Sequence, residues 1–388
     1  MHHKMTVLSI MIIYLTALNY AATDKNPNFE FSGVHEFWKI ADILIQDKEP
    51  LHEQWEALFN TPGYAEMFRR EFKEETFQRY YRAAFMPSKS SDIQKMKDAA
   101  ADGGNKFRLW FTNSMFESLD YSFKNKEKII AKVKSFESFP YTENAIKELL
   151  IYLPEDKVGM PPDVSFIIFN DSRGYTPVIM SINELTREEE LLTPNRLAIL
   201  QKQGYTKERP HVLYFAHEFF HYYRDQMREF KFPDQESDDY SLIWRLDQIE
   251  NEGIADLINV RQLYLDGCCF ADTDWAKQIG DEQARQPEVI KKFDKILSEI
   301  TDQPSQHKEF NAEIRRLITR AGHPTGFYMA NVILGQLGRQ ALVDVVRSPF
   351  KFFYLYNKAA KMNGSVPVFS TKSIQRIKKL EKKYGLFS

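Results

Sequence analysis

One stretch of this 388-residue sequence decides its fold: Tyr214-Phe215-Ala216-His217-Glu218-Phe219-Phe220-His221. On a helix, His217 and His221 stand one turn apart on the same face. Two neutral imidazoles at this spacing can hold one Zn²⁺ at about 2.0–2.1 Å each. Glu218 would project beside the metal, where its carboxylate can take a proton from a zinc-bound water. The pattern therefore predicts metal-assisted hydrolysis.

The aromatic residues around the motif allow a second interpretation. Five of them flank the histidines: Phe215, Phe219, Phe220, Tyr222 and Tyr223. Such flanks are typical of a buried helix, in which two histidines need share no ligand. A catalytic zinc site also requires an apolar wall, because that wall limits solvent access and strengthens electrostatic interactions. The flanks alone leave both interpretations open.

A third ligand must come from elsewhere, because a catalytic zinc ion takes three protein ligands and leaves its fourth position for water. Residues 246–258 predict a second helix, with apolar residues at helical spacing. Glu252 on this helix follows His221 by 31 residues, which leaves room for a polar loop and a return of the chain. Glu252 is therefore the predicted third ligand, and Glu250 is the competing one.

Asp256 stands one turn after Glu252, on the same helix face. A metal-bound histidine usually donates its other ring N–H to a carboxylate, which fixes its tautomer and orientation. We therefore expect Asp256 to orient His217, and this pairing favours Glu252 over Glu250. Small Gly253 would let the two helices approach closely. The alternative is that both carboxylates belong to an exposed acidic helix face.

Together, His217-Glu218-x-x-His221 and Glu252-x-x-x-Asp256 resemble the gluzincin zinc metallopeptidases, the thermolysin-like group. The interval between the two motifs is longer than in thermolysin itself. More narrowly, the chain resembles a bacterial family of zinc-dependent peptidases with little biochemical characterisation. Three further stretches carry that narrower likeness: residues 54–64, 170–175 and 322–330. The resemblance implies one Zn²⁺ per chain and a hydrolase that cleaves peptide bonds.

The segments along the chain predict a fold that is mainly α with a small β-sheet (α+β). Amphipathic segments broken by turn residues predict helices from residue 29 to about residue 150. We expect an N-terminal helical lobe over residues 23–155. A zincin-like catalytic lobe with a helical C-terminal part would follow over residues 156–388.

Residues 164–169 and 176–182 are rich in β-branched and aromatic residues and predict a hairpin. The likeness to gluzincins implies an edge strand that binds an extended peptide, and an open strand edge offers N–H and C=O groups for this. Thr176, Val178 and Met180 are therefore the candidate substrate-binding residues. An ordinary structural hairpin is the alternative.

Peptide hydrolysis places negative charge on the attacked carbonyl oxygen, and sites of this kind usually supply a His or Tyr donor besides zinc. His323 precedes Pro324, which suits the start of a helix. Tyr328 lies about one turn further on. His323 and Tyr328 are the candidate oxyanion donors. For each, the alternative is a hydrogen-bonded core or capping residue.

The N-terminal residues predict export. Residues 5–18 are apolar and residues 19–22 offer a cleavage site, so residues 1–22 predict a signal peptide. An uncleaved membrane anchor is the alternative, although this stretch is shorter than the roughly 20 residues that a spanning helix needs. Adjacent Cys268 and Cys269 are the only cysteines and cannot form a disulfide framework. A periplasmic or secreted bacterial protein fits this pattern.

Composition limits the partners. The formal net charge of −2 offers no electrostatic case for nucleic acid. A peptide or protein substrate is what the resemblance implies. The basic run over residues 372–383 predicts a solvated helix face, with membrane-surface binding as the alternative. Two other functions would use the same motif residues. One is a zinc hydrolase acting on a non-peptide bond, and the other is a non-catalytic envelope protein with a structural metal site.

Overall fold

The computed structural model describes residues 26, 28–70, 72–102, 106–136, 138–170, 172–258, 273–300 and 304–386. The predicted signal peptide and both cysteines lie outside the described residues. The structure is mainly helical with one small sheet, which confirms the predicted fold class. No helix among the described residues combines the length and apolar character that crossing a membrane requires.

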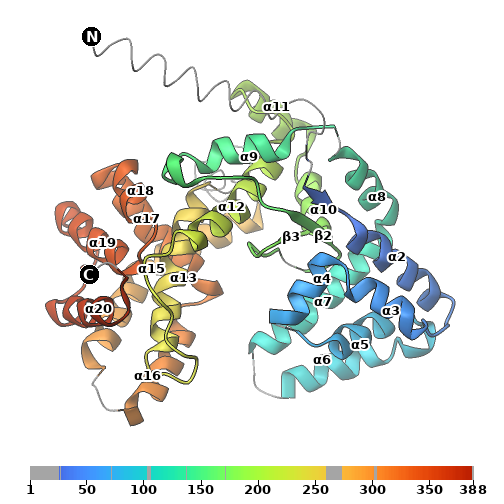
Figure 1. Ribbon diagram of the computed structural model, residues 1–388, viewed down its shortest axis with the longest axis horizontal. Coiled ribbons are helices and arrows are strands. Elements are labelled where there is room, and N and C mark those ends of the chain that lie inside the picture. The colour runs from blue at the N-terminus through green and yellow to red at the C-terminus, as the bar shows by residue number, and fades with distance from the viewer. Residues whose placement is uncertain are drawn as a thin grey trace. The chain divides into compact units, whose positions relative to one another are not determined.

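Two compact units make up the described chain (Figure 1). The first is built from the described parts of Met1–Asn144, Asp163–Asp171 and Met180–Thr186, and the second from Ala145–Pro162, Ser172–Ile179 and Arg187–Ser388. The chain therefore passes between the units several times, whereas the sequence led us to expect one boundary near residue 155. Short segments within residues 163–186 belong to each unit, which a single boundary cannot describe.

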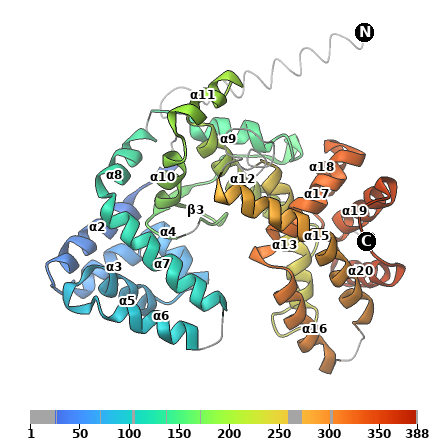
Figure 2. The same ribbon diagram turned by 180° about the vertical axis from the view of Figure 1, so that it is seen from behind.

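The first unit packs helices around the start of the sheet. Its helices are α2 (Ser32–Ile45), α3 (His52–Phe59), α4 (Pro62–Arg70), α5 (Glu74–Phe85), the short 3₁₀ helix η1 (Pro87–Lys89), α6 (Asp92–Asp102), α7 (Lys106–Lys124) and α8 (Lys126–Ser135). Figure 2 shows α5, α6 and α7 side by side. Aromatic rings fill the core: the ring of Phe77 lies 5.0 Å from that of Phe68 and 5.5 Å from that of Phe169. Such ring pairs add about 0.5–1.5 kcal/mol each beyond their buried area.

The sheet has three strands in the order β1-β2-β3, namely β1 (Phe29–Glu30), β2 (Val164–Ile167) and β3 (Val178–Ser181). β1 and β2 run parallel, with Phe29 opposite Val164. All residues of β2 and β3 are buried, as expected for strands rich in β-branched and aromatic residues. The two strands predicted from the sequence are therefore present as β2 and β3.

The second unit is a helical assembly. Its elements are η2 (Glu155–Lys157), α11 (Pro194–Lys202), α12 (Arg209–Gln226), α13 (Tyr240–Ile258), α15 (Asp274–Glu299), α16 (Pro304–Leu317), η3 (Arg320–Gly322), α17 (His323–Leu337), α18 (Arg339–Val345), α19 (Pro349–Asn363) and α20 (Thr371–Tyr384), while α9 (Tyr141–Leu149) and α10 (Ile182–Glu190) are shared with the first unit. α17 packs against α13, α15, α18 and α19. Its residues are mostly apolar, because a helix with neighbours on several sides must bury most of its surface.

Candidate metal centre

Helix α12 presents both histidines of the motif on one buried face. Pro210 lies in its first turn, where the fixed φ of proline suits a helix start. His217 and His221 are 4% and 9% exposed, and Glu218 is buried as well. The Nε2 atoms of the two imidazoles lie 3.1 Å apart. The helical spacing therefore brings two potential ligand nitrogens to one point.

Helix α13 brings a carboxylate to the same point. Glu252 Oε2 lies 3.3 Å from His221 Nε2 and 3.6 Å from His217 Nε2. All three donor atoms lie within 4.8 Å of one another. The fold therefore brings together the three residues that the sequence predicts as metal ligands.

The state of Glu252 Oε2 tests whether this cluster fits a metal ion. The atom is buried and has no hydrogen-bond partner among the described residues, although imidazole nitrogens surround it. Ligands of one tetrahedral ion at 2.0–2.1 Å stand about 3.3 Å apart, which is close to the separations in this cluster. Two imidazole nitrogens and one carboxylate oxygen form a ligand set of catalytic zinc. The residues therefore fit Zn²⁺.

Asn251 hydrogen-bonds Nδ1 of His221, the ring nitrogen that does not face Glu252. The Oδ1 atom of Asn251 lies 2.9 Å from His221 Nδ1, so Nδ1–H donates to the amide oxygen. This hydrogen bond leaves the lone pair of Nε2 directed toward Glu252. The sequence analysis missed Asn251, because its place directly before Glu252 does not reveal its contact with His221.

Asp256 connects a third histidine to the cluster. Its carboxylate is fully buried, and its Oδ2 atom lies 3.0 Å from His323 Nδ1 at the start of α17. Its Oδ1 atom lies 3.8 Å from His217 Nδ1. The Nε2 atom of His323 in turn lies 3.2 Å from Glu252 Oε2. Asp256 therefore hydrogen-bonds His323 and approaches His217, the residue that the sequence analysis assigned to it.

The two candidate oxyanion donors occupy different places on α17. His323 lies beside Glu252. Tyr328 is half-buried and lies near Tyr356 of α19. Burial is the main cause that raises the pKa of the Tyr356 phenol, and the neighbouring Tyr328 raises this pKa further. Five residues separate His323 from Tyr328, which on a helix puts their side chains on different faces. The structure therefore places His323 beside Glu252 and Tyr328 near Tyr356 of α19.

The charges in the cluster depend on one another. Burial lowers the pKa of His221, but the carboxylates of Glu252 and Glu218 outweigh burial and raise this pKa to about 10. Burial likewise raises the pKa of Glu252, but His323 and His221 outweigh it and hold this pKa well below its usual range. Without a metal, the Glu252 carboxylate is therefore ionised and stabilises a protonated His221.

Glu250, the competing ligand in the sequence analysis, points elsewhere. It is fully buried and forms an ion pair with Arg224, a fully buried residue of α12. Asp247 lies 2.5 Å from the same guanidinium. Burial raises the pKa of Glu250, and the guanidinium of Arg224 acts to lower it. This ion-pair network joins α12 to α13. Glu250 belongs to the network and therefore does not join the three donor atoms of the cluster.

The segment before β3 lies directly against α12. A β-carbon built on Gly174 would lie 2.5 Å from His221 Cβ and 2.8 Å from the carbonyl oxygen of Glu218, so this segment needs a glycine there. The neighbouring residue, Arg173, pairs with Ile179: the N–H group of each donates to the C=O of the other at 2.8 Å. This bridge covers the edge of β3 at Ile179.

The residues expected to bind substrate differ in their exposure. The side chains of Val178 and Met180 are buried within β3, whereas Thr176 is exposed. Gly174, which precedes them, lies against the motif helix, a contact that the sequence did not predict. The signal for this closeness was the glycine itself, within the stretch of residues 170–175 that carried the family likeness.

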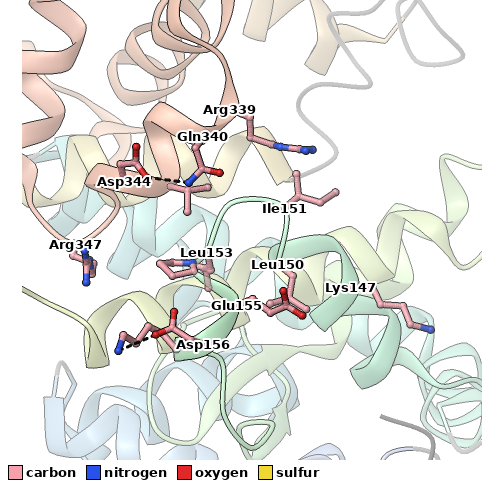
Figure 3. Close-up of a pocket in the computed structure, with 13 residues that line it drawn as sticks. Lys147, Leu150, Ile151, Leu153, Glu155, Asp156, Arg339, Gln340, Asp344 and Arg347 are labelled. Atoms are coloured by element: carbon pink, nitrogen blue, oxygen red, sulfur yellow. Dashed lines mark hydrogen bonds and ion pairs between the residues drawn. The ribbon is translucent and has the colours of Figure 1, made fainter. Parts of the chain in front are cut away.

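One cavity lies apart from this cluster. It measures about 770 Å³ and lies beside η2 and α18 (Figure 3). Its lining mixes basic and acidic side chains, including Lys147, Arg339, Glu155 and Asp156. None of the described residues around Glu252 lines it, so this cavity is not the metal centre.

The fold and the cluster define a mainly helical protein with a buried group of two histidines and one carboxylate, residue types that can bind zinc. A family model matches residues 55–365, and the chain belongs to that family, "Putative zinc dependent peptidase (DUF5700)". This match confirms the narrower resemblance found in the sequence, and it spans α12, α13 and α17. No curated protein and no solved structure matches the chain.

Proposed function

We propose that this chain is an exported zinc metallopeptidase of the gluzincin type, with one zinc ion per chain. The observation that carries the proposal is the buried Oε2 atom of Glu252, which faces the Nε2 atoms of His217 and His221 without a hydrogen bond of its own. The family supports a zinc-dependent peptidase at a coarser level. Export is proposed from the N-terminal sequence alone.

His217, His221 and Glu252 would hold the metal. A bound zinc ion supplies Lewis acidity, which polarises a carbonyl group and makes water easier to deprotonate. Asn251 keeps Nδ1 of His221 protonated, so that Nε2 is the ligand atom. Because these groups are buried, little solvent screens the charges of the site.

Glu218 would act as the general base. It follows His217 directly on α12, is buried, and lies close enough to His221 to raise the pKa of that imidazole. Its carboxylate would take the proton of the attacking water and then deliver it to the leaving amine. A positioned base of this kind contributes about 10²–10⁴-fold to a rate.

His323 would stabilise the negative charge that develops on the carbonyl oxygen. Its Nδ1–H group donates to Asp256, which fixes the ring so that Nε2 faces the cluster. Asp256 would thereby position His323, and through its 3.8 Å approach also His217. Tyr328 faces α19 and is therefore the weaker candidate for this role.

The segment over residues 172–176 would form the rim that receives a peptide. It lies against α12 at Gly174, and exposed Thr176 ends it. Backbone groups of an extended segment can hydrogen-bond a substrate backbone by strand addition. We place the substrate contact on this segment because Ile179 of β3 already pairs with Arg173.

The test compares the full chain with Glu218→Gln and with Glu208→Gln, a control that alters a carboxylate at the start of the same helix. Bound zinc is measured by elemental analysis, and cleavage of a mixture of unstructured peptides by mass spectrometry. We expect one zinc ion in all three proteins and a loss of at least about a hundredfold in cleavage rate for Glu218→Gln alone. Unchanged cleavage by Glu218→Gln contradicts the mechanism. Hydrolysis of esters but of no peptide contradicts the substrate class.

A further inference from the structure

Residues of helices α19 and α20 line a second cavity, of about 540 Å³, in the C-terminal part of the chain. Tyr354, Met362 and Ile374 give it an apolar wall. Tyr354 and Met362 share one face of α19, because eight residues separate them, and Ile374 comes from α20. Met362 is 57% exposed, so this apolar surface is open to solvent.

Three lysines line the same cavity: Lys358, Lys361 and Lys378. Each is exposed, and none has an ion-pair partner within the described ranges of the chain. No acidic side chain is among the described residues that line the cavity. Lys358 and Lys361 lie one turn apart on α19, and Lys378 lies one turn after Ile374 on α20. The cavity therefore combines an apolar wall with three uncompensated positive charges.

The two helices as a whole carry the same excess of positive charge. α19 has three lysines and no acidic residue, and α20 has six basic residues and one acidic residue, Glu381. The carboxylate of Glu381 accepts a hydrogen bond of 2.9 Å from the Tyr354 hydroxyl. The whole chain has a net charge of −2, so this excess is local. Such a patch attracts anions and anionic membrane surfaces.

We propose that this cavity binds an anionic phospholipid. The phosphate would contact the ammonium groups of Lys358, Lys361 and Lys378, and the first acyl carbons would pack on Tyr354, Met362 and Ile374. A small inorganic anion would use the charges but leave the apolar wall unoccupied. A neutral lipid would use the wall but leave the lysines without counter-charges. The volume lies within the range of about 300–1,000 Å³ that is usual for ligand pockets.

The first experiment titrates the full chain with soluble short-chain lipids. Dihexanoylphosphatidylglycerol and dihexanoylphosphatidylcholine share their acyl chains and differ in net charge, and glycerol phosphate supplies the anion without chains. Binding is followed by calorimetry and by the NMR signal of the Met362 methyl group, assigned with Met362→Leu. We expect phosphatidylglycerol to shift this signal and to bind at least about tenfold more tightly than phosphatidylcholine, since each lysine near an anionic group contributes about 1 kcal/mol.

Equal binding of the two lipids would overturn the proposal, and so would a Met362 signal that does not respond. Glycerol phosphate binding as tightly as the lipid would show a site for free phosphate esters instead. Displacement of the lipid by polyglutamate at equal affinity would assign the surface to acidic proteins, which also overturns the lipid assignment.

The second experiment changes the charges. A triple variant, Lys358→Glu with Lys361→Glu and Lys378→Glu, should lose roughly a hundredfold or more in affinity for phosphatidylglycerol. The matched control makes the same change at three exposed lysines elsewhere, Lys89, Lys202 and Lys277, and should bind as the wild type does. A single Lys361→Gln variant, expected to lose about fivefold, repeats the test with little risk to folding. Equal losses in triple variant and control, or no loss in any variant, would contradict the proposal.

Discussion

Gly253 and Gly326 touch backbone to backbone where α13 crosses α17. A β-carbon built on Gly253 would lie 2.4 Å from the carbonyl carbon of Gly326, and one built on Gly326 would lie 2.0 Å from the carbonyl oxygen of Ile249. Glu252 adjoins the first glycine, and His323 lies one turn before the second. The glycine contact therefore sets the distance at which His323 meets Glu252.

Replacing Gly326 with alanine should force α17 away from α13. Backbone atoms cannot give way as a flexible side chain can, so we expect a loss of about 1–3 kcal/mol in the free energy of unfolding. The rate of peptide cleavage should fall by more than the loss of folded protein explains, because His323 would move away from Glu252. Chemical denaturation and cleavage assays measure the two effects.

Gly335→Ala on the same helix is the matched control. Nothing lies within 4 Å of a β-carbon at that position, so alanine should raise the free energy of unfolding by roughly 0.5–1 kcal/mol through better helix propensity. Gly326→Ala as stable and as active as Gly335→Ala would show that the glycine contact does not position His323.

The parts of the site that could be predicted are those that follow from helical period. His217 and His221 on α12 share a face whatever surrounds the helix, and so do Glu252 and Asp256 on α13. The contact between Asp256 and His323 crosses 67 residues, and no local pattern encodes it. The sequence analysis attributed the small size of Gly253 to an approach of α12, but the close contact in the structure is with α17.

The fold could be predicted from the sequence to about the same extent as the site. The mainly helical class and the two strands followed from periodicity and from β-branched residues, and the structure confirms both. The interleaving of the two units could not be predicted, because it depends on which surfaces the short segments around β2 and β3 contact. The bridge between Arg173 and Ile179 likewise depends on the path of an irregular segment between two strands.

Arg224 should be the most sensitive structural residue of α12. It is fully buried, and Arg224→Ala would leave the carboxylate of Glu250 without its cation and that of Asp247 with Arg228 alone, 3.8 Å away. Breaking a buried ion pair in this way costs about 3–5 kcal/mol of unfolding free energy. Part of this loss should be recovered in acid, where protonation neutralises the two carboxylates. Urea denaturation at several pH values measures both effects.

Arg285→Ala, on the exposed surface of α15, is the control for Arg224→Ala. Its guanidinium hydrogen-bonds only the carbonyl oxygen of Asp281 among the described residues, so we expect a change below about 1 kcal/mol. Similar losses for the two arginines would mean that the Asp247 and Glu250 carboxylates are not held by Arg224.

Zinc uptake should release a proton from His221. In the metal-free chain, Glu252 and Glu218 overcome burial and raise the pKa of this imidazole from 6.5 to about 10, whereas a zinc ligand must be neutral. Between pH 6.5 and 10 the apparent zinc affinity should therefore rise with pH. Calorimetry in buffers of different protonation enthalpy counts the released protons. A zinc affinity that is constant over this interval would refute the assigned charge state.

The same shifts predict how the metal-free chain responds to pH. Because the folded pKa of His221 is raised, its contribution to stability is complete below pH 6.5 and is lost as the pH rises toward 10. The folded pKa of Glu252 is lowered, so its contribution is present above about pH 4.5 and is lost in acid. Their combined stabilisation should be greatest between these limits, as thermal unfolding of the chelated protein can show. Glu252→Gln should remove most of this pH dependence.

Gly174→Ala should impair the metal centre through the backbone of α12. The added methyl group would lie 2.5 Å from His221 Cβ and 2.8 Å from the carbonyl oxygen of Glu218, so either α12 or the segment over residues 172–176 must shift. A shift of α12 would separate His221 from Glu252 and lower zinc affinity. A shift of the segment would leave zinc binding intact and raise KM for peptides.

Zinc titration and peptide kinetics distinguish these two outcomes for Gly174→Ala. Gly159→Ala is the matched control, because nothing lies within 4 Å of a β-carbon there. We expect a fall of at least about tenfold in kcat/KM for Gly174→Ala and no change for Gly159→Ala, since small displacements near reacting groups cost large factors in rate. Wild-type zinc affinity together with wild-type kcat/KM in Gly174→Ala would show that the segment neither supports His221 nor receives the substrate.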